Sequence, residues 1–114
     1  MLPFRRRLTF EQRRTEFERI HAHRATRIPV IMEANGIDTP RIDKEKFLVP
    51  FDLTVSQLMF VARRRLSMDS SKALFLLING TLPPSSATMS SLYDSHASED
   101  GFMYVVYTTE NTFG

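Results

Sequence analysis

Three stretches of the chain repeat apolar residues at the three- and four-residue spacing that is typical of amphipathic helices. The first spans residues 10–20 and carries a narrow apolar stripe among charged residues: Phe10, Phe17 and Ile20. The second opens at Leu53-Thr54, and its stripe consists of Val55, Leu58, Met59, Ala62 and Leu66. A third, shorter pattern contains Met89, Leu92 and Tyr93. Thr9 stands directly before the first stretch and is a suitable N-cap, so we expect that helix to begin at Phe10.

Four other stretches are rich in β-branched and apolar residues, which predicts strands at residues 27–33, 46–51, 73–78 and 102–107. The last strand is apolar on both of its alternating faces and is therefore expected in the middle of a sheet. Pro50 has no backbone N–H to donate, which places the second strand at a sheet edge. Asn79-Gly80 predicts a turn directly after the third strand. The pattern indicates an α+β domain with four strands that follows an N-terminal helical segment.

Length and composition agree with one globular domain. The 114 residues contain 42% hydrophobic and 25% charged residues, and no run of eighteen apolar residues that could cross a membrane. The first residues lack the apolar core of a secretory signal, and the chain has no cysteine for a disulfide, a thiol nucleophile or a thiolate metal site. We therefore expect a cytoplasmic protein.

Charge is unevenly distributed along the chain, although the net charge is only +2. Residues 1–27 carry eight arginines and three glutamates, whereas residues 28–114 carry an excess of acidic groups. A basic segment on a mildly acidic body suggests an anionic partner, which could be an acidic peptide, an anionic lipid or a nucleic acid. A solvated helix face explains the same charges equally well.

No group of residues suggests catalysis or metal binding. His21 and His23 are two residues apart, so a helix would point them in different directions, and His96 is isolated. Glu99-Asp100 precedes Gly101 and is better explained as a turn than as a pair of catalytic carboxylates. We therefore expect no catalytic residue, no metal site and no cofactor, and a protein that is a substrate of enzymes instead of an enzyme.

The C-terminal segment combines a strand with a polar tail, Thr108–Gly114, that ends at a glycine. Glycine tolerates backbone angles that are closed to other residues, so such a tail can enter a narrow active site. One interpretation is that the tail presents its terminal carboxylate to other enzymes, and the other is that the chain merely ends there.

Several stretches together resemble the autophagy ubiquitin-like modifiers, the family of the GABA-receptor-associated protein and autophagy-related protein 8. They are Phe10-Glu11, Arg27-Ile28-Pro29-Val30-Ile31, Lys46-Phe47-Leu48-Val49-Pro50, Asp52-Leu53-Thr54-Val55, Arg63-Arg64-Arg65, Leu82-Pro83-Pro84, Ala87-Thr88-Met89, Leu92-Tyr93, and Glu99-Asp100-Gly101-Phe102 through Asn111-Thr112-Phe113-Gly114. The resemblance begins near residue 10 and stays in register except around residues 34–43.

The resemblance implies a ubiquitin-like β-grasp fold with a four-stranded mixed sheet and two additional N-terminal helices. Residues 1–25 would be a helical extension packed on the domain, residues 26–108 the β-grasp domain, and residues 109–114 a flexible conjugation tail. E1-like and E2-like enzymes would join Gly114 to phosphatidylethanolamine on the autophagosome membrane, and a deconjugating cysteine protease would release it. The lipidated protein would recruit cargo receptors and adaptors that carry aromatic-x-x-aliphatic motifs with acidic neighbours.

The resemblance also implies where such a peptide binds, namely along the edge strand at residues 46–51, by β-augmentation. The aromatic pocket would be formed by Glu16, Ile20, Pro29, Ile31, Lys46, Leu48 and Phe102. The aliphatic pocket would be formed by Phe47, Val49, Pro50, Leu53, Leu58 and Val61. Arg27 and Arg65 would contact peptide carboxylates. Core packing is the competing interpretation for Phe47, Leu53 and Leu58.

The chain departs from the family pattern at a few positions, and two other functions stay open. Leu58 and Leu77 stand where relatives often carry phenylalanine, and Phe51 replaces a small residue beside the edge strand. Residues 1–9 match poorly.

One alternative is an unconjugated ubiquitin-like interaction module. The other is nucleic-acid or microtubule binding through the basic N-terminus, against which stands the expectation that Phe10 and Phe17 are packed and give bases no aromatic platform.

Overall fold

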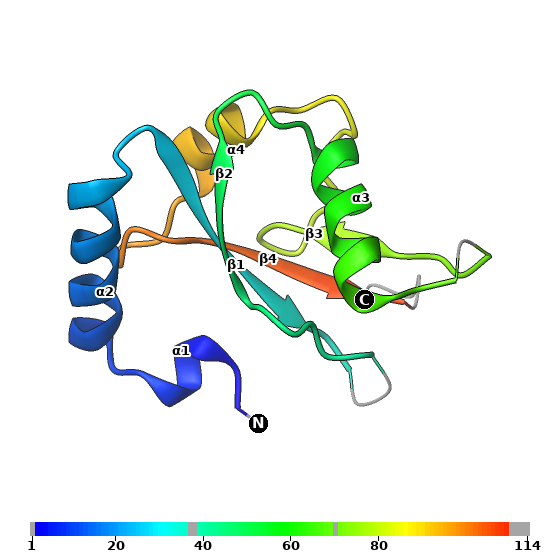
Figure 1. Cartoon of the computed structure of the whole chain (residues 1–114), viewed down its shortest axis with the longest axis horizontal. Coiled ribbons are helices and arrows are strands. Elements are labelled where there is room, and N and C mark those ends of the chain that lie inside the picture. The colour runs from blue at the N-terminus through cyan, green and yellow to red at the C-terminus, as the bar shows by residue number, and fades with distance from the viewer. Residues whose placement is uncertain (1, 37–38, 70, 110–114) are drawn as a thin grey trace.

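The computed structural model describes residues 2–36, 39–69 and 71–109, which form a four-stranded mixed sheet with helices on both faces (Figure 1). The elements in chain order are α1 (Phe4–Arg7), α2 (Phe10–His23), β1 (Arg27–Ala34), β2 (Lys46–Pro50), α3 (Val55–Leu66), β3 (Phe75–Leu77), α4 (Met89–His96) and β4 (Met103–Thr108). The strand order is β2-β1-β4-β3, with β1 and β4 parallel and the other two pairs antiparallel. The last strand is therefore central and β2 lies at an edge, as predicted.

The two longest helices begin at capping boxes. The side chain of Thr9 accepts a hydrogen bond from the backbone N–H of Gln12 at 3.1 Å, and the Gln12 side chain accepts one from the Thr9 N–H at 2.8 Å. Thr54 and Gln57 make the same pair of hydrogen bonds at the start of α3. These reciprocal bonds satisfy backbone donors that a helix N-terminus leaves free, and so they fix where each helix starts.

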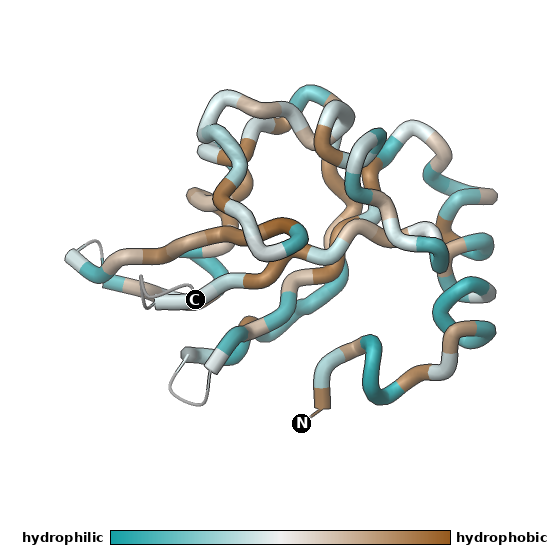
Figure 2. Tube along the Cα trace, turned by 180° about the vertical axis from the view of Figure 1, so that it is seen from behind, coloured by the Kyte–Doolittle hydropathy of each residue, from teal (hydrophilic) through white to brown (hydrophobic). Residues whose placement is uncertain are grey.

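Strand side chains alternate between two hydrophobic clusters, one on each face of the sheet. The larger cluster lies under α3 and α4 and includes Val30, Leu58, Met89, Val105 and Tyr107. The smaller cluster lies under α1 and α2 and includes Phe4, Ile20, Ile31, Phe102 and Tyr104. Figure 2 shows the matching distribution along the chain, with apolar residues concentrated in the strands and hydrophilic residues frequent along α2. Both faces of the central strand are thus buried.

Two strands are shorter than the pattern predicts. β3 covers only Phe75–Leu77, because Ile78 already belongs to the turn and exchanges two backbone hydrogen bonds with Thr81. That turn is built on positive φ angles, 51° at Asn79 and 77° at Gly80. β2 ends at Pro50 and excludes Phe51, because the chain turns there and the Leu53 N–H donates to the Pro50 carbonyl at 3.3 Å.

The expected packing of Phe10 is wrong, because its side chain is 45% exposed. Phe4, from the segment that matches the family poorly, is 4% exposed and meets the Phe102 ring edge-on at 5.3 Å. Phe17 meets the same ring edge-on at 5.9 Å. The N-terminal helices therefore attach to the sheet through Phe4, Phe17 and Ile20.

Candidate functional site: an edge strand with two flanking grooves

The edge strand β2 has a single neighbour among the described strands, β1, to which it pairs over five positions from Lys46 opposite Ile31 to Pro50 opposite Arg27. A five-residue strand is roughly 16 Å long at 3.3 Å per residue. Its outer edge can therefore accept about five residues of an added strand by backbone hydrogen bonding.

The side chains of β2 alternate between the two faces of the sheet. Leu48 packs against the cluster under α1 and α2, whereas Phe47 and Val49 belong to the cluster under α3 and α4. Lys46 lies on the same face as Leu48, because their positions differ by two. A strand added at this edge would likewise direct successive side chains toward α2 and toward α3 in turn.

A groove between α2 and β2, called here the α2 groove, lies on the face of Leu48. It has a volume of about 420 Å³ and is lined by Arg19, Ile20, His23, Arg24, Lys44, Lys46 and Leu48. Its apolar members are Ile20 and Leu48, and the other five side chains are basic or titratable. Such a lining suits an apolar side chain with acidic neighbours, since carboxylates would meet several cations at the rim.

Glu16 connects the two walls of this groove. Its carboxylate accepts hydrogen bonds from Arg19 at 2.6 and 3.2 Å on its own helix, and from the Lys46 ammonium on β2. These bonds, first from Arg19 and then from Lys46, lower the pKa of Glu16 to about 2. The carboxylate is therefore ionised at neutral pH and joins α2 to Lys46 on β2.

The other residues expected at the aromatic pocket lie beneath this surface. Pro29 is buried, and Ile31 and Phe102 are both 0% exposed in the cluster under α2. Ile20 is 7% exposed. Of these four residues only Ile20 lines the α2 groove in this conformation. Glu16, Lys46 and Leu48 are the partly exposed members of the expected pocket, and Lys46 and Leu48 line the groove.

The residues expected at the aliphatic pocket are divided in the same way. Phe47, Val49 and Leu58 are 7%, 8% and 1% exposed and belong to the core cluster under α3. Leu53 and Val61 are half-buried, and Pro50 is exposed. The three core residues can contact a ligand only if α3 and β2 separate, whereas the other three are accessible as the protein stands.

A second groove, called here the α3 groove, has a volume of about 390 Å³ and is lined by Phe60, Val61, Arg64 and Arg65. Phe60 is 61% exposed, and Arg64 lies over its ring at 5.8 Å. Phe60 and Arg64 were not among the residues expected at the site. The helical spacing of positions 60, 61, 64 and 65 places them on one face, and that spacing was the signal available in the sequence.

The two arginines expected to contact peptide carboxylates are both exposed. Arg65 lies 3.7 Å from the Asp43 carboxylate and 6.0 Å from the Phe47 ring. Arg27 is opposite Pro50 at the end of β2 and has no ion pair with another described residue. Both guanidinium groups therefore carry charge at the accessible surface near the edge strand. The other expected site residue, Gly114, lies outside the described residues.

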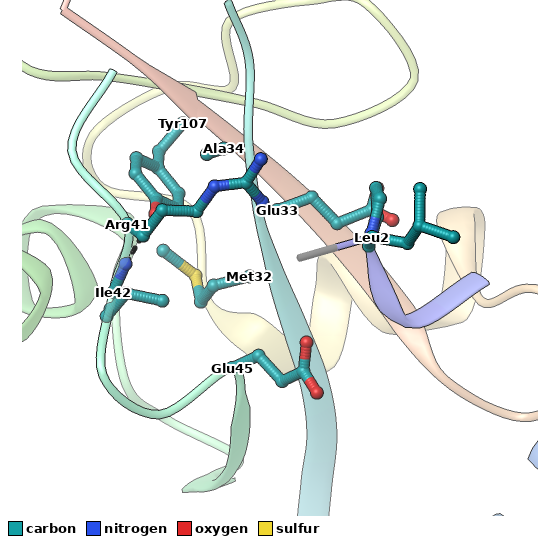
Figure 3. Close-up of a pocket in the computed structure, with 9 residues that line it drawn as sticks. Leu2, Met32, Glu33, Ala34, Arg41, Ile42, Glu45 and Tyr107 are labelled. Atoms are coloured by element: carbon teal, nitrogen blue, oxygen red, sulfur yellow. Dashed lines mark hydrogen bonds between the residues drawn. The ribbon is translucent and has the colours of Figure 1, made fainter. Parts of the chain in front are cut away.

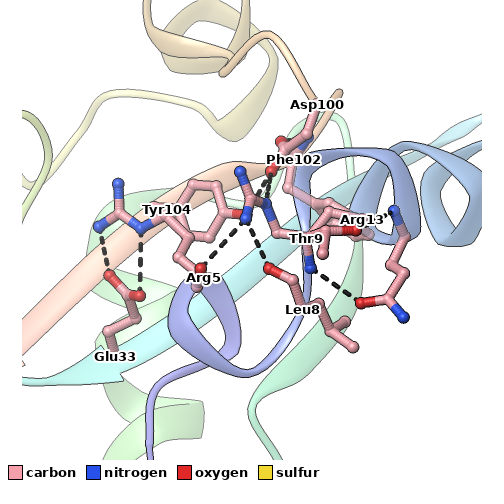
Figure 4. Close-up of polar contacts among 9 residues, drawn as sticks. Arg5, Leu8, Thr9, Arg13, Glu33, Asp100, Phe102 and Tyr104 are labelled. Atoms are coloured by element: carbon pink, nitrogen blue, oxygen red, sulfur yellow. Dashed lines mark hydrogen bonds and ion pairs between the residues drawn. The ribbon is translucent and has the colours of Figure 1, made fainter.

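A buried polar network, missed by sequence reasoning, holds α2 in place beside the groove (Figure 4). Asp100 is 0% exposed, and its carboxylate accepts hydrogen bonds from Arg13 Nε at 2.8 Å, the Tyr104 hydroxyl and the Phe102 N–H at 3.0 Å. Arg13 also donates to the Leu8 carbonyl at 2.9 Å. Burial and the Asp100 hydrogen bond raise the pKa of Tyr104, so its hydroxyl is a donor at neutral pH.

A small cavity lies at the other end of β1, beside the N-terminus (Figure 3). Leu2, Met32, Glu33, Arg41 and Tyr107 are among its lining residues. Its volume of about 70 Å³ is far below the roughly 300–1,000 Å³ that is typical of small-molecule sites. The Tyr107 hydroxyl donates to the Pro40 carbonyl at 2.9 Å and accepts from the Ile42 N–H at 2.8 Å. These bonds attach the loop before β2 to the central strand.

Comparison with known proteins identifies a single family. The family model described as "Autophagy protein Atg8 ubiquitin like" matches residues 12–114. The chain is 51% identical over 112 residues to autophagy-related protein 8 of Kluyveromyces lactis, covering 97% of this chain and 90% of that protein. It is 50% identical over 112 residues to the Saccharomyces cerevisiae protein of the same name, covering 97% and 96%.

A solved structure gives the same result for the fold. The crystal structure of Trypanosoma brucei ATG8 matches with a TM-score of 0.88 and 38% sequence identity, covering 100% of this chain and 99% of that one. The predicted ubiquitin-like fold is thereby confirmed. Within the described part of the chain, every helix is too short or too polar to span a bilayer.

Proposed function

Because this chain belongs to the Atg8 family of ubiquitin-like autophagy proteins, we propose that it is a modifier joined through Gly114 to phosphatidylethanolamine on autophagic membranes. In that state it recruits cargo receptors and adaptors that carry an aromatic-x-x-aliphatic motif. The proposal rests on the family assignment. What it adds is the lipid to which the protein is joined and the partners that it recruits.

The alternation of side chains along β2 is the observation that carries the recruitment part of the proposal. Residues three apart in an extended peptide point to opposite faces, because the side-chain period of a strand is two. The aromatic residue would then enter the α2 groove beside Leu48, and the aliphatic residue three positions later would meet α3 beside Val61. The spacing of the motif is odd, as two side chains on opposite faces of an added strand require.

The charges around the α2 groove support a preference for acidic peptides. Arg19, Arg24 and Lys44 line it together with Lys46, and Arg27 stands at the far end of β2. Partly exposed ion pairs of this kind contribute only about 0.2–1 kcal/mol each, so they select and orient the peptide more than they hold it. Most of the affinity would come from the backbone ladder and the two apolar side chains.

The tail has a separate role in the proposal. The central strand β4 ends at Thr108, which leaves residues 109–114 as the segment that E1-like and E2-like enzymes would act on and that a cysteine protease would cleave from the lipid. Two acyl chains contribute roughly 0.8 kcal/mol per buried methylene, so the conjugate stays on the membrane until that cleavage. Residues 26–108 would form the recruiting domain, and residues 1–25 the extension that forms one wall of its groove.

Peptide binding tests the edge-strand site. The Lys46→Ala/Leu48→Ala variant removes one side of the α2 groove without touching the core under α3, and should weaken binding of a Glu-Glu-Trp-Ser-Ser-Leu peptide at least tenfold by calorimetry. Leu82→Ala is the matched control, since Leu82 is an exposed leucine outside both grooves and should leave affinity unchanged. Unchanged affinity in the double variant, with an unchanged melting temperature, would reject the site.

A further inference from the structure

A third groove lies beyond the end of β2, where the chain turns away from the sheet. Called here the α2–α4 groove, it lies between the C-terminal end of α2 and α4, with a volume of about 290 Å³. Its apolar lining consists of Ala25, Ile28, Pro29, Phe51 and Tyr93. This volume is slightly below the roughly 300–1,000 Å³ of small-molecule sites, so the groove suits one large side chain better than a free ligand.

Phe51 is the residue that makes this groove apolar at its outer wall. Its side chain is 48% exposed, while its backbone is held by the Ser90 N–H, which donates to the Phe51 carbonyl at 3.0 Å. Ile28 and Pro29 are buried and form the floor. The Tyr93 hydroxyl donates a hydrogen bond to the Gly101 carbonyl at 2.6 Å, so the part of Tyr93 that remains to contact a ligand is its aromatic ring. An exposed phenylalanine next to buried apolar residues can bind an apolar side chain of a partner.

The groove is continuous with the edge strand, so the occupant can be inferred from the direction of the bound peptide. This step rests on the proposed function. The aromatic residue is placed at the α2 groove, whose β2 members are Lys46 and Leu48. The exposed Pro50 and the half-buried Leu53 are accessible members of the expected aliphatic pocket and lie at the other end of β2, so the aliphatic residue is placed there. The peptide therefore runs parallel to β2, and the residues that follow its aliphatic position arrive beside Phe51.

The face that each following residue meets is set by strand alternation. The aromatic residue and the residue directly after the aliphatic one are four positions apart, so both point toward α2. Arg27 and Pro29 lie on that same face of the sheet, because they differ by an even number of positions from Ile31, which packs under α2. We propose that the α2–α4 groove binds a large apolar side chain at the position directly after the aliphatic residue of the recruited peptide.

The charges at the rim fit the same occupant. Arg27 stands at the junction of β2 and the groove with no ion pair to another described residue, and His21 is also among the lining residues. Asp94 on α4 is the acidic side chain at the opposite rim. A peptide whose acidic groups flank an apolar residue can therefore pair with Arg27 while its side chain contacts Phe51.

Three designed peptides test the proposal by calorimetry. The core peptide is Glu-Glu-Trp-Ser-Ser-Leu-Gly-Gly-Gly, and the other two replace the first or the second of these glycines with phenylalanine. We expect phenylalanine at the first position to tighten binding about tenfold, or about 1.4 kcal/mol, and at the second position less than threefold. Phe51→Ser should abolish the gain and leave affinity for the core peptide unchanged. Leu82→Ser, at a side chain that is 53% exposed, is the matched control and should keep the gain.

Chemical-shift changes give a readout that does not depend on the variant. The backbone amides of Ser90 and Asp94 on α4 should shift with the first-position peptide and stay still with the core peptide. Equal affinities of the core and first-position peptides for the unchanged protein would overturn the proposal while leaving the edge-strand site intact. A gain that survives Phe51→Ser would also overturn it, as would concentration-dependent dimerisation that Phe51→Ser abolishes. Failure of all three peptides to bind would reject the edge-strand site and this groove together.

Discussion

Replacing Arg13 with alanine should destabilise the fold severely, although the loss of either of the two other arginines on α2, Arg14 and Arg19, should cost little. The substitution removes the cationic partner of Asp100, whose side chain is 1% exposed, and also the hydrogen bonds to the Leu8 and Arg5 carbonyls at 2.9 and 3.1 Å. Tyr104 and Phe102 still donate to the Asp100 carboxylate. Its negative charge, however, is left in the interior without an ion-pair partner, and Arg5 acts on it only at longer range.

The size of the effect follows from that burial. Breaking a buried ion pair by removing one partner costs about 3–5 kcal/mol, because the remaining charge is uncompensated. A chain of this length has a total stability on the order of 6–17 kcal/mol. At roughly 4 °C per kcal/mol, the melting temperature should fall by about 12–20 °C. Arg14→Ala is the matched control, since the Arg14 and Glu18 side chains are 46% and 63% exposed and their pair contributes about 0.5 kcal/mol or less.

Urea unfolding monitored by circular dichroism measures the difference, and a second substitution tests its cause. Asp100→Asn placed on the Arg13→Ala background removes the stranded charge while keeping an acceptor for Tyr104 and Phe102. The double variant should therefore be more stable than Arg13→Ala alone. The uncompensated-charge explanation is wrong if the unfolding free energy of Arg13→Ala lies within 1 kcal/mol of that of the unchanged protein. It is also wrong if the double variant is no more stable than Arg13→Ala.

Two further predictions concern the groove wall and the turn before β4. Because the pKa of Glu16 is lowered to about 2 from 4.5, its contribution to stability is fully present above pH 4.5 and is lost as the pH falls toward 2. The difference in unfolding free energy between the unchanged protein and Glu16→Gln should therefore shrink over that interval in urea titrations, and a difference independent of pH would contradict the assignment. Gly101→Ala should destabilise more than Gly80→Ala. Both glycines have positive φ, but a Cβ at Gly101 would lie 2.3 Å from the Phe17 ring, whereas none of the described atoms lies within 4 Å of one at Gly80. Equal melting temperatures of the two variants would show that the Phe17 ring gives way freely.

The central and edge positions of the strands could be predicted because each depends on local chemistry. Apolar residues on both faces of 102–107 require burial on both sides, and Pro50 cannot donate to a second neighbour. The extent of β3 could not be predicted in the same way. Leu74 and Ile78 are as apolar as the residues between them and as buried as Leu76 and Leu77, so the hydrophobic pattern does not indicate where strand pairing stops.

The network around Asp100 was beyond sequence reasoning for a different reason. Arg13 and Asp100 are 87 residues apart, and an arginine on a charged helix has the same local pattern whether it is solvated or buried.

The exposure of Phe10 has a similar origin. Helical spacing placed Phe10 on the apolar stripe, but Phe4 and Phe17 already cover Phe102, which leaves Phe10 beside Arg13 at the surface. Tertiary competition between side chains determines such outcomes.

The candidate site also has a part that could be predicted from the sequence and a part that could not. The edge strand and the apolar members of the α2 groove, Ile20 and Leu48, could be predicted from Pro50, strand alternation and the family resemblance. The accessible surface on α3 could not, because Phe60 and Arg64 were not among the positions that the resemblance implied. In addition, Phe47 and Leu58 turned out to be core residues in this conformation, which was the competing interpretation for both.

Conjugation tests the central claim most directly. The protein would be mixed with the E1-like and E2-like enzymes of the family, ATP and phosphatidylethanolamine liposomes, in parallel with Gly114→Ala and with a known relative as the positive control. The proposed function predicts an ATP-dependent gel shift that floats with the liposomes and is absent from Gly114→Ala. If the relative is conjugated and this protein is not, it is not a lipid-conjugated modifier, and an unconjugated interaction module becomes the better explanation of its edge strand.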